Sequence, residues 1–253
     1  MLVTVRRVLL PFCGIALVIG AWWALVASGL IDDTPTPGAV FTRMVEGIRS
    51  GDLLVDIRLS VLRVLIGVSI GCVAAVPVGF ALAWYAVVRS MFNPLVSFFR
   101  ALPPLALIPL VIVYLGIDET ARISILVYAA FFSAVIVIYE SVAAIEDVYV
   151  RAARALGANQ FELFRRVVVP LTVPQIFVGV RVALGVCWAT VVAAELVAAQ
   201  RGLGAMMQDA ANFARQTDVF VGIILIGLSA VGMDWVVRQL LARTVRWQEW
   251  VVR

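Results

Sequence analysis

Residues 174–199 read PQIFVGVRVALGVCWATVVAAELVAA and contain two charged side chains, Arg181 and Glu195. An α-helix of this length reaches about 39 Å, which is enough to cross the hydrocarbon core of a bilayer. The rest of the chain has the same character, because 63% of its residues are hydrophobic and 14% are charged. Its mean hydropathy is +1.05, and this composition is far more apolar than that of soluble domains. We therefore expect a membrane protein.

Similar apolar stretches repeat on both sides of this one and leave no room for a separate soluble domain among 253 residues. We predict an all-α, polytopic membrane fold that forms one domain over 1–253. It should have about six transmembrane helices, at 8–30, 60–84, 93–116, 123–145, 174–199 and 219–237. Between the first two, Thr34-Pro35-Thr36-Pro37 precedes apolar residues at helical spacing and predicts a short interfacial helix.

The predicted third span contains the run Leu102-Pro103-Pro104 and a further proline, Pro109. Because proline lacks a backbone N–H, this run cannot form a continuous hydrogen-bonded helix. A break at membrane depth is tolerated only where protein or a water-filled cavity satisfies the freed carbonyl groups. We therefore expect a broken helix here, either beside a passage or as a simple packing kink.

The chain contains no lysine and no histidine, and all 20 basic residues are arginine. A phosphate-binding P-loop needs a lysine, so ATP must be hydrolysed by another chain if it is used at all. Cys13, Cys72 and Cys187 lie far apart in apolar segments and lack the paired spacing of a metal or redox site. We expect no metal and no cofactor in this chain. The arginines fall in short runs between the spans, which indicates membrane topology and not a nucleic-acid partner.

The arginines also predict the orientation of the chain. With six spans both termini lie on one side, where the loops carry eleven arginines against seven in the opposite loops. Because cytoplasmic loops carry the excess of positive charge, both termini should be cytoplasmic. The interfacial helix is then periplasmic, and the long polar segment 146–170 lies inside the cell.

Residues 151–170 of that segment read RAARALGANQFELFRRVVVP. The pattern predicts a short helix over 148–156 with small side chains, ended by Gly157. A second helix should begin at Phe161 and stop at Pro170. The segment is therefore predicted to form a helix-turn-helix on the cytoplasmic face, with an ordinary solvated loop as the alternative.

This segment resembles the signature loop of bacterial ABC-importer permeases, in which Glu-Ala-Ala is followed by three residues, Gly, nine residues and Ile-x-Leu-Pro. Ala152, Ala153, Gly157 and Pro170 fall in register with it, whereas Arg151 replaces the glutamate and two valines replace the isoleucine and leucine. Nearly the whole chain is similar to the subfamily that imports taurine, aliphatic sulfonates or nitrate, with taurine permeases the most similar. Further stretches that carry this resemblance are 60–64, 102–110, 116–120 and 193–204.

The resemblance implies a multi-pass permease of a bacterial cytoplasmic (inner) membrane that pairs with a second copy of itself and works by alternating access. In such importers the loop is a coupling helix that docks on a separate ABC ATPase, and two copies of this ATPase bind ATP and Mg. By resemblance, the docking residues are Ala152, Ala153, Arg154, Gly157 and Phe161.

The family also implies a periplasmic or lipid-anchored solute-binding protein as a partner. Gly202, Leu203 and Gly204 resemble the outer loop that contacts this protein, and a plain turn is the alternative.

The two charges of the fifth span lie about 21 Å apart along one helix, so Arg181 and Glu195 cannot pair with each other. A charge that faces lipid is unfavourable by a few kcal/mol, so both should face the bundle interior or a wet cavity. One hypothesis places them with Arg100, Pro103 and Pro104 along the path of an anionic or zwitterionic substrate. In the alternative, the arginines snorkel to the headgroups and Glu195 forms a structural ion pair or hydrogen bond.

The favoured function is the permease of an ATP-driven importer, which is not itself an enzyme. An ion-coupled secondary transporter is the alternative, since broken helices and intramembrane charges also suit that class. It would need coupling-ion ligands at the midplane, and none clusters in the sequence. A membrane enzyme would need an unusual carboxylate or serine arrangement, because histidine and lysine are absent.

Overall fold

The computed structural model describes residues 2–31 and 33–245, and the side chains of 2–12 and of Ala198 lie outside this description. The described residues form helices and no strand, so the predicted all-α fold is confirmed. The helices are α1 (Leu2–Ala27), α2 (Pro37–Ser50), α3 (Asp52–Trp84), α4 (Ala86–Ala101), α5 (Pro104–Leu115), α6 (Glu119–Ala143), α7 (Asp147–Ala155), α8 (Gln160–Leu163), a π-helix (Phe164–Val168), α9 (Val169–Ala198), α10 (Leu203–Asn212) and α11 (Gln216–Thr244).

Four described helices are long and apolar enough to cross a membrane: α3, α6, the continuous stretch Gln160–Val197 and α11. The pair α4 and α5 counts as a fifth span if it is taken together, although the two helices are bent by 95°. The predicted first span, 8–30, overlaps α1, which ends at Ala27. The part of α1 whose side chains are described, Cys13–Ala27, is apolar but shorter than the other spans.

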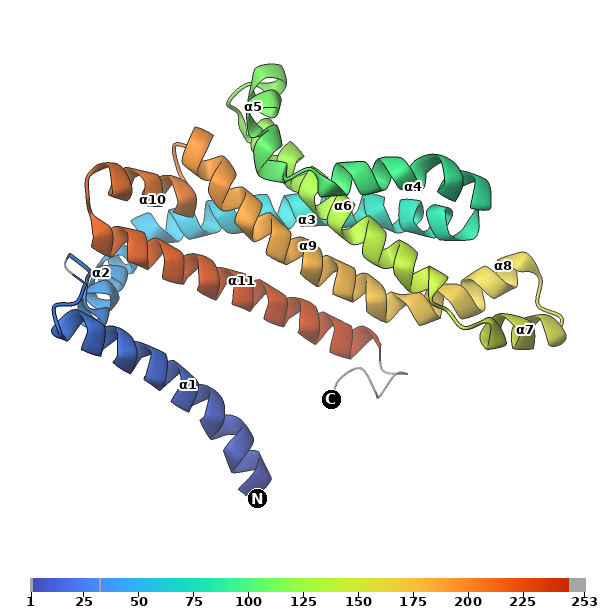
Figure 1. Cartoon of the computed structure of the whole chain (residues 1–253), viewed down its shortest axis with the longest axis horizontal. Helices are drawn as coiled ribbons and strands as arrows, with labels where there is room; N and C mark the ends of the chain where they lie inside the picture. Colours follow the sequence, from blue (N-terminus) through green and yellow to red (C-terminus); the bar gives the residue numbers. More distant parts are fainter. Residues whose placement is uncertain (1, 32, 246–253) are drawn as a thin grey trace.

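The centre of the bundle is built from α3, α6 and α9, and α11 lies along α9 (Figure 1). α3 approaches α6 closely because small residues recur on α3 at every fourth position, where they form one stripe. A Cβ added at Gly71 would lie 2.6 Å from the Cβ of Ala130 and 2.8 Å from the carbonyl oxygen of Val127. Helices in membranes associate through such close backbone packing. The stripe consists of Gly67, Gly71, Ala75 and Gly79.

The expected break in the third span is present. α4 ends at Ala101, Leu102 and Pro103 are extended, and α5 begins at Pro104. The last carbonyl groups of a helix have no partner within that helix. Here the hydroxyl of Tyr128 on α6 donates to the carbonyl oxygen of Phe99 over 2.5 Å, which satisfies one of them.

Two boundaries differ from the expectation. The third span was expected from residue 93, but α4 begins at Ala86, and its junction with α3 is at Tyr85. Pro170 does not stop the second helix of segment 146–170, because it lies in the first turn of α9. Proline is tolerated in a first helical turn, where its missing N–H would have no partner in any case. The π-helix immediately before α9 joins it to α8 without an interruption.

The bundle has two distinct ends. α2 and α10 lie at one end, and α7 and α8 project at the other (Figure 1). The start of α2 is fixed by Thr36, whose side chain accepts from the backbone N–H of Ala39 over 3.2 Å. Its end is fixed by Gly51, which adopts φ +86° and leads directly into α3. The predicted interfacial helix is thus present as a short helix set against the long spans.

Candidate functional site

The segment with the signature resemblance folds as a hairpin of two short helices, α7 and α8, which we call the α7–α8 hairpin (147–163). α7 ends where Gly157 takes φ +85°, a conformation that L side chains rarely adopt. α8 begins with a capping box, in which the Asn159 side chain accepts from the N–H of Glu162 over 2.9 Å. The Glu162 carboxylate accepts from the N–H of Asn159 over 3.1 Å in return. These local bonds fix the start of α8 after the turn.

The α7–α8 hairpin presents a free apolar surface. α7 buries none of its residues against the chain. The side chain of Leu156 is 89% exposed and that of Phe161 is 66% exposed. The structure places the five predicted docking residues on this one projecting element: Ala152, Arg154, Gly157 and Phe161 are exposed, and Ala153 is half-buried. Exposed large apolar side chains beside small ones suit a partner that approaches closely.

Glu195 belongs to a different site, near the opposite end of α9. It is 1% exposed. Its carboxylate accepts from Ser60 Oγ at 2.8 and 2.9 Å, from Arg63 Nη1 at 2.6 Å and from the N–H of Gly204 at 2.8 Å. A buried carboxylate is tolerated when it is both paired and hydrogen-bonded in this way. These contacts fit the alternative in which Glu195 forms a structural ion pair and hydrogen bonds.

Arg63 on α3 is the centre of this network. Its Nε and Nη2 donate to the Glu119 carboxylate at 2.8 and 2.5 Å, and its Nη1 also donates to the carbonyl oxygen of Arg201 at 2.8 Å. Glu119 in turn accepts from Arg122 Nη1 at 2.8 Å. The planar guanidinium suits this two-pronged recognition of a carboxylate. Four separate segments, α3, α6, α9 and the turn before α10, are joined through one side chain.

The backbone of the α9–α10 turn completes the network. The N–H groups of Gly202, Leu203 and Gly204 donate to Asp56 Oδ1 at 3.0 Å, to Ser60 Oγ at 3.0 Å and to Glu195 Oε2 at 2.8 Å, respectively. Gly202 adopts φ +133°, and a Cβ there would lie 2.6 Å from the Glu195 carboxyl carbon. We call these groups the polar clamp: Asp56, Ser60, Arg63, Glu119, Glu195 and the N–H groups of 202–204.

The polar clamp changes the interpretation of Gly202, Leu203 and Gly204. All three are buried, and their N–H groups are engaged inside the chain. Any contact with a binding protein would have to come from exposed neighbours such as Arg201 and Asp209. The resemblance singled out the turn between α9 and α10, and in the structure the N–H groups of these three residues bind side chains of the same chain.

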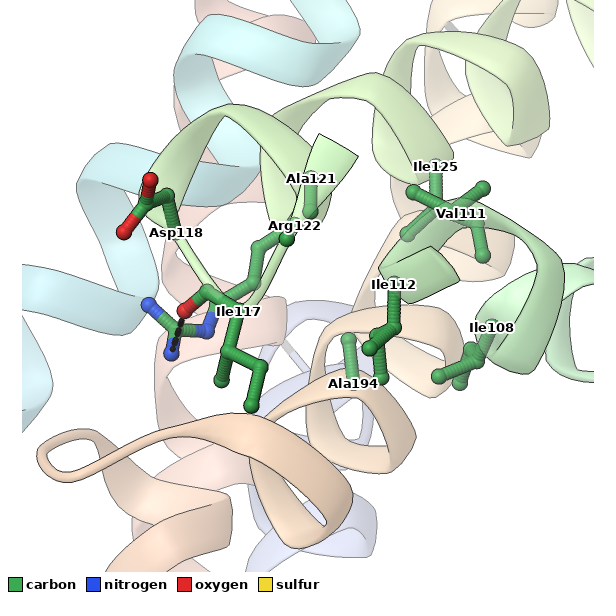
Figure 2. A pocket seen from close by; sticks show the side chains of 10 residues that line it. Ile108, Val111, Ile112, Ile117, Asp118, Ala121, Arg122, Ile125 and Ala194 are labelled. Atoms are coloured by element: carbon green, nitrogen blue, oxygen red, sulfur yellow. Dashed lines mark hydrogen bonds between the residues drawn. The ribbon is translucent and has the colours of Figure 1, made fainter. Parts of the chain in front are cut away.

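Beside the polar clamp, α5 packs over the start of α6 and over Ala194 of α9 (Figure 2). Ile108, Val111 and Ile112 of α5 line a small apolar pocket there. Arg122 closes one side of it, and its Nη2 donates to the carbonyl oxygen of Ile117 at 3.0 Å. The pocket is too narrow and apolar for a polar solute, and it ties the bent α4–α5 pair to the bundle core.

Arg181 has its own partner on α11. Its Nε donates to Asp234 Oδ1 at 2.6 Å, and Asp234 Oδ2 accepts from Arg238 Nε at 2.7 Å. Two arginines therefore share one carboxylate, and the group keeps an excess of one positive charge. The side chains of Arg181 and Asp234 are about one third exposed in the single chain. Arg100 is exposed in the last turn of α4, next to exposed Pro103 and half-buried Pro104.

Sequence reasoning missed Arg63 as the partner of Glu195 and Asp234 as the partner of Arg181, and it missed Glu119 as the second partner of Arg63. A signal was available for two of them, because Arg63 and Asp234 lie within predicted spans and a charge in a span needs a partner. Among the described residues, no three Cys, Asp or Glu side chains gather in a way that could hold a metal ion.

Comparison with known proteins places this geometry in context. Residues 67–246 match the family described as binding-protein-dependent transport system inner membrane component. The chain is 45% identical to a probable ABC transporter permease protein of Brucella abortus, over 91% of this chain and 92% of that protein. It is 33% identical to the taurine transport system permease protein of Escherichia coli, over 96% and 90%. An inward-facing structure of the MetNI methionine ABC transporter shares the fold, with a TM-score of 0.62, 20% identity and coverage of 78% of this chain and 96% of that one. The chain therefore belongs to the family of inner-membrane permease components of binding-protein-dependent ABC transport systems.

Proposed function

We propose that this permease moves a small anionic or zwitterionic solute into the cytoplasm by alternating access, powered by a separate ATPase subunit. Taurine or another sulfonate is the favoured substrate, with nitrate as the alternative, and the similarity to the taurine permease supports this choice. The working assembly would contain two copies of this chain, two ATPases that bind ATP and Mg, and a solute-binding protein. It would lie in the inner membrane with both termini in the cytoplasm.

The single observation that carries the proposal is the free surface of the α7–α8 hairpin. The α7–α8 hairpin has no fully buried residue in α7 and exposes Leu156 and Phe161, so it needs a partner to cover it. Small side chains at Ala152 and Ala153 permit a close approach by that partner, and Arg154 provides a charge at the rim.

The passage for the solute would run beside the second group of charges. The group of Arg181, Asp234 and Arg238 has one positive charge in excess and is partly exposed, which suits the passage of an anion. Arg100 with the break at Pro103 and Pro104 is the other candidate wall of this passage. Glu195 contributes indirectly in this proposal, since the polar clamp keeps α9 in register with α3 and α6.

Co-purification tests the docking surface. The tagged chain is purified with its candidate ATPase, and wild type is compared with Ala152→Trp, which adds bulk to an exposed position of α7. Ala211→Trp, at an exposed position of α10 at the other end of the bundle, is the matched control. We expect the ATPase to stay with wild type and with Ala211→Trp and to be lost, at least tenfold, from Ala152→Trp. Equal binding by Ala152→Trp, or a wild type that retains no ATPase, contradicts the proposal.

A further inference from the structure

An apolar groove of about 690 Å³ opens where α3 ends and α9 begins. Its floor comes from the second half of α3, and its walls come from α8, the π-helix and the first turns of α9. Aromatic side chains dominate the lining, with Phe164 placed 5.3 Å from Phe80 and 5.4 Å from Trp84 between ring centroids. The lining residues are Val76, Pro77, Phe80, Ala81, Trp84, Tyr85, Gln160, Phe161, Phe164, Val169 and Ile176.

Two irregularities of the backbone border this groove. Pro77 lies within α3 and removes one N–H from the hydrogen-bond ladder of that helix. The π-helix Phe164–Val168 widens the helical path on the opposite wall. Single-turn π-helices are rare and occur often at functional sites, because the wider turn leaves a side chain or carbonyl out of the regular packing. Irregular backbone in α3 and in the π-helix therefore shapes the groove on both sides.

Arginines occur close in the chain to lining residues on two sides of the groove. The Arg89 guanidinium donates to the carbonyl oxygens of Leu82 and Ala83 at 3.2 and 2.9 Å, so it lies over the end of α3 beside lining residue Trp84. On the other wall, Arg165 and Arg166 directly follow lining residue Phe164, and both are exposed. Arg166 forms an ion pair with Glu162 over 3.7 Å. An apolar, aromatic groove on helices that also carry exposed arginines fits an amphiphile that has an apolar tail and an anionic head.

We propose that this groove binds one acyl chain of an anionic phospholipid, whose phosphate lies against Arg89 and Arg165. Most of the apolar lining belongs to α3 and to the start of the stretch Gln160–Val197, which are long and apolar enough to cross a membrane and so to meet lipid. Tryptophan and tyrosine at the mouth match the level of the headgroups, where such side chains are enriched. Basic pockets between transmembrane helices are suited to anionic headgroups. Because Phe161 belongs both to the groove and to the α7–α8 hairpin, bound lipid would brace the root of that hairpin.

Lipid retention tests this site directly, without reference to the ATPase. The purified chain is exchanged into detergent with phosphatidylglycerol or phosphatidylcholine of identical acyl chains, and bound lipid is counted by native mass spectrometry. We expect phosphatidylglycerol to be retained about tenfold better than phosphatidylcholine. Arg165→Gln should reduce this retention about fivefold, which corresponds to the attraction of one arginine at an anionic surface. Ala81→Phe, which fills the groove floor, should abolish it.

Arg243→Gln and Ala211→Phe change exposed residues away from the groove and should retain the lipid as wild type does. A thermal unfolding curve for each variant separates loss of the site from loss of the fold. Equal retention of the two lipids overturns the proposal. So does a preference for phosphatidylglycerol that Arg165→Gln and Ala81→Phe leave intact, because the lipid then lies elsewhere. Cross-linking of a cysteine at Ala81 to a second copy or to the ATPase would assign the groove to a protein and overturn it as well.

Discussion

Glu195 is the residue at which α3, α9 and the turn before α10 meet. Its side chain is inaccessible, and its oxygens accept from Ser60, Arg63 and the N–H of Gly204. Removing one partner of a buried ion pair leaves the other charge without compensation, which costs about 3 kcal/mol. We therefore expect Glu195→Ala to lower the free energy of unfolding by about this amount. Thermal unfolding of the purified chain in detergent measures the effect.

The surface pair Arg166 and Glu162, whose side chains are 77% and 35% exposed, provides the control for this residue. Its nitrogen and oxygen are 3.7 Å apart at the helix surface, so Glu162→Gln should change stability by less than about 1 kcal/mol. Adding Arg63→Met to Glu195→Ala should cost less than the sum of the single changes, because the orphaned charge is then removed. Strict additivity, or a loss for Glu195→Ala no larger than the control, would refute the role of the polar clamp.

The sequence can predict the contacts of these residues only where the partners lie close together in the chain. The capping box of Asn159 and Glu162 involves residues three apart, so its pattern is visible in sequence. Arg63 and Glu195 are separated by 132 positions, and only the packing of α3 against α9 brings them together. Sequence therefore identified Glu195 as a charge in need of a partner but could not choose among the arginines.

At the scale of helices, the α3–α6 contact rests on glycines that have no room for a side chain. A Cβ at Gly71 would lie 2.9 Å from the backbone nitrogen of Phe131, whereas a Cβ at Gly227 on α11 meets nothing within 4 Å. Alanine favours a helix over glycine by about 1 kcal/mol at either position. Overpacking at Gly71 should outweigh this gain by about 1 to 2 kcal/mol. We thus expect Gly71→Ala to destabilise the chain and Gly227→Ala to leave it unchanged or more stable.

Paired melting curves of these two glycine variants, recorded in one detergent, compare the same chemical change on two helices. Gly185 on α9, where a Cβ likewise meets nothing within 4 Å, serves as a second open position. If Gly71→Ala melts at or above the temperature of Gly227→Ala, then α3 and α6 do not approach as closely as the structure requires.

Pro103 and Pro170 explain why proline patterns predicted one helix boundary correctly and another wrongly. Pro103 follows a helix end and stands in extended backbone, where its ring excludes a continued helix. Pro170 stands in the first turn of a helix, where proline fits, and the π-helix before it keeps the chain helical. The sequence signal is a proline in both places. Only the hydrogen-bond pattern of the preceding turn distinguishes a helix start from a helix end.

For the whole molecule, the length of α3 separates the two ends of the bundle. Its 33 residues span about 50 Å, with α2 at its start and the α3–α4 junction near the α7–α8 hairpin at its end (Figure 1). Hydropathy predicted the number of spans approximately, and the structure supplied the bend of α4 against α5 and the joining of α8 to α9. The end of α4 receives a tertiary hydrogen bond from Tyr128 to Phe99, which no local pattern encodes, and α8 is joined to α9 by the π-helix.

The position of α10 and the α7–α8 hairpin at opposite ends makes the orientation of the chain testable by labelling. Cys13, Cys72 and Cys187 are replaced by alanine, and a single cysteine is placed at Ala155 or at Asp209, both of which are exposed. The excess of arginine beside the hairpin predicts that Ala155→Cys faces the cytoplasm. A membrane-impermeant maleimide should then label it in inside-out vesicles only, and should label Asp209→Cys in right-side-out vesicles only.

Detergent-opened vesicles, in which both cysteines must react, control for accessibility. The reverse pattern would place the hairpin outside, where it could not meet a cytoplasmic ATPase, while labelling of both from one side would contradict the separation of the two ends.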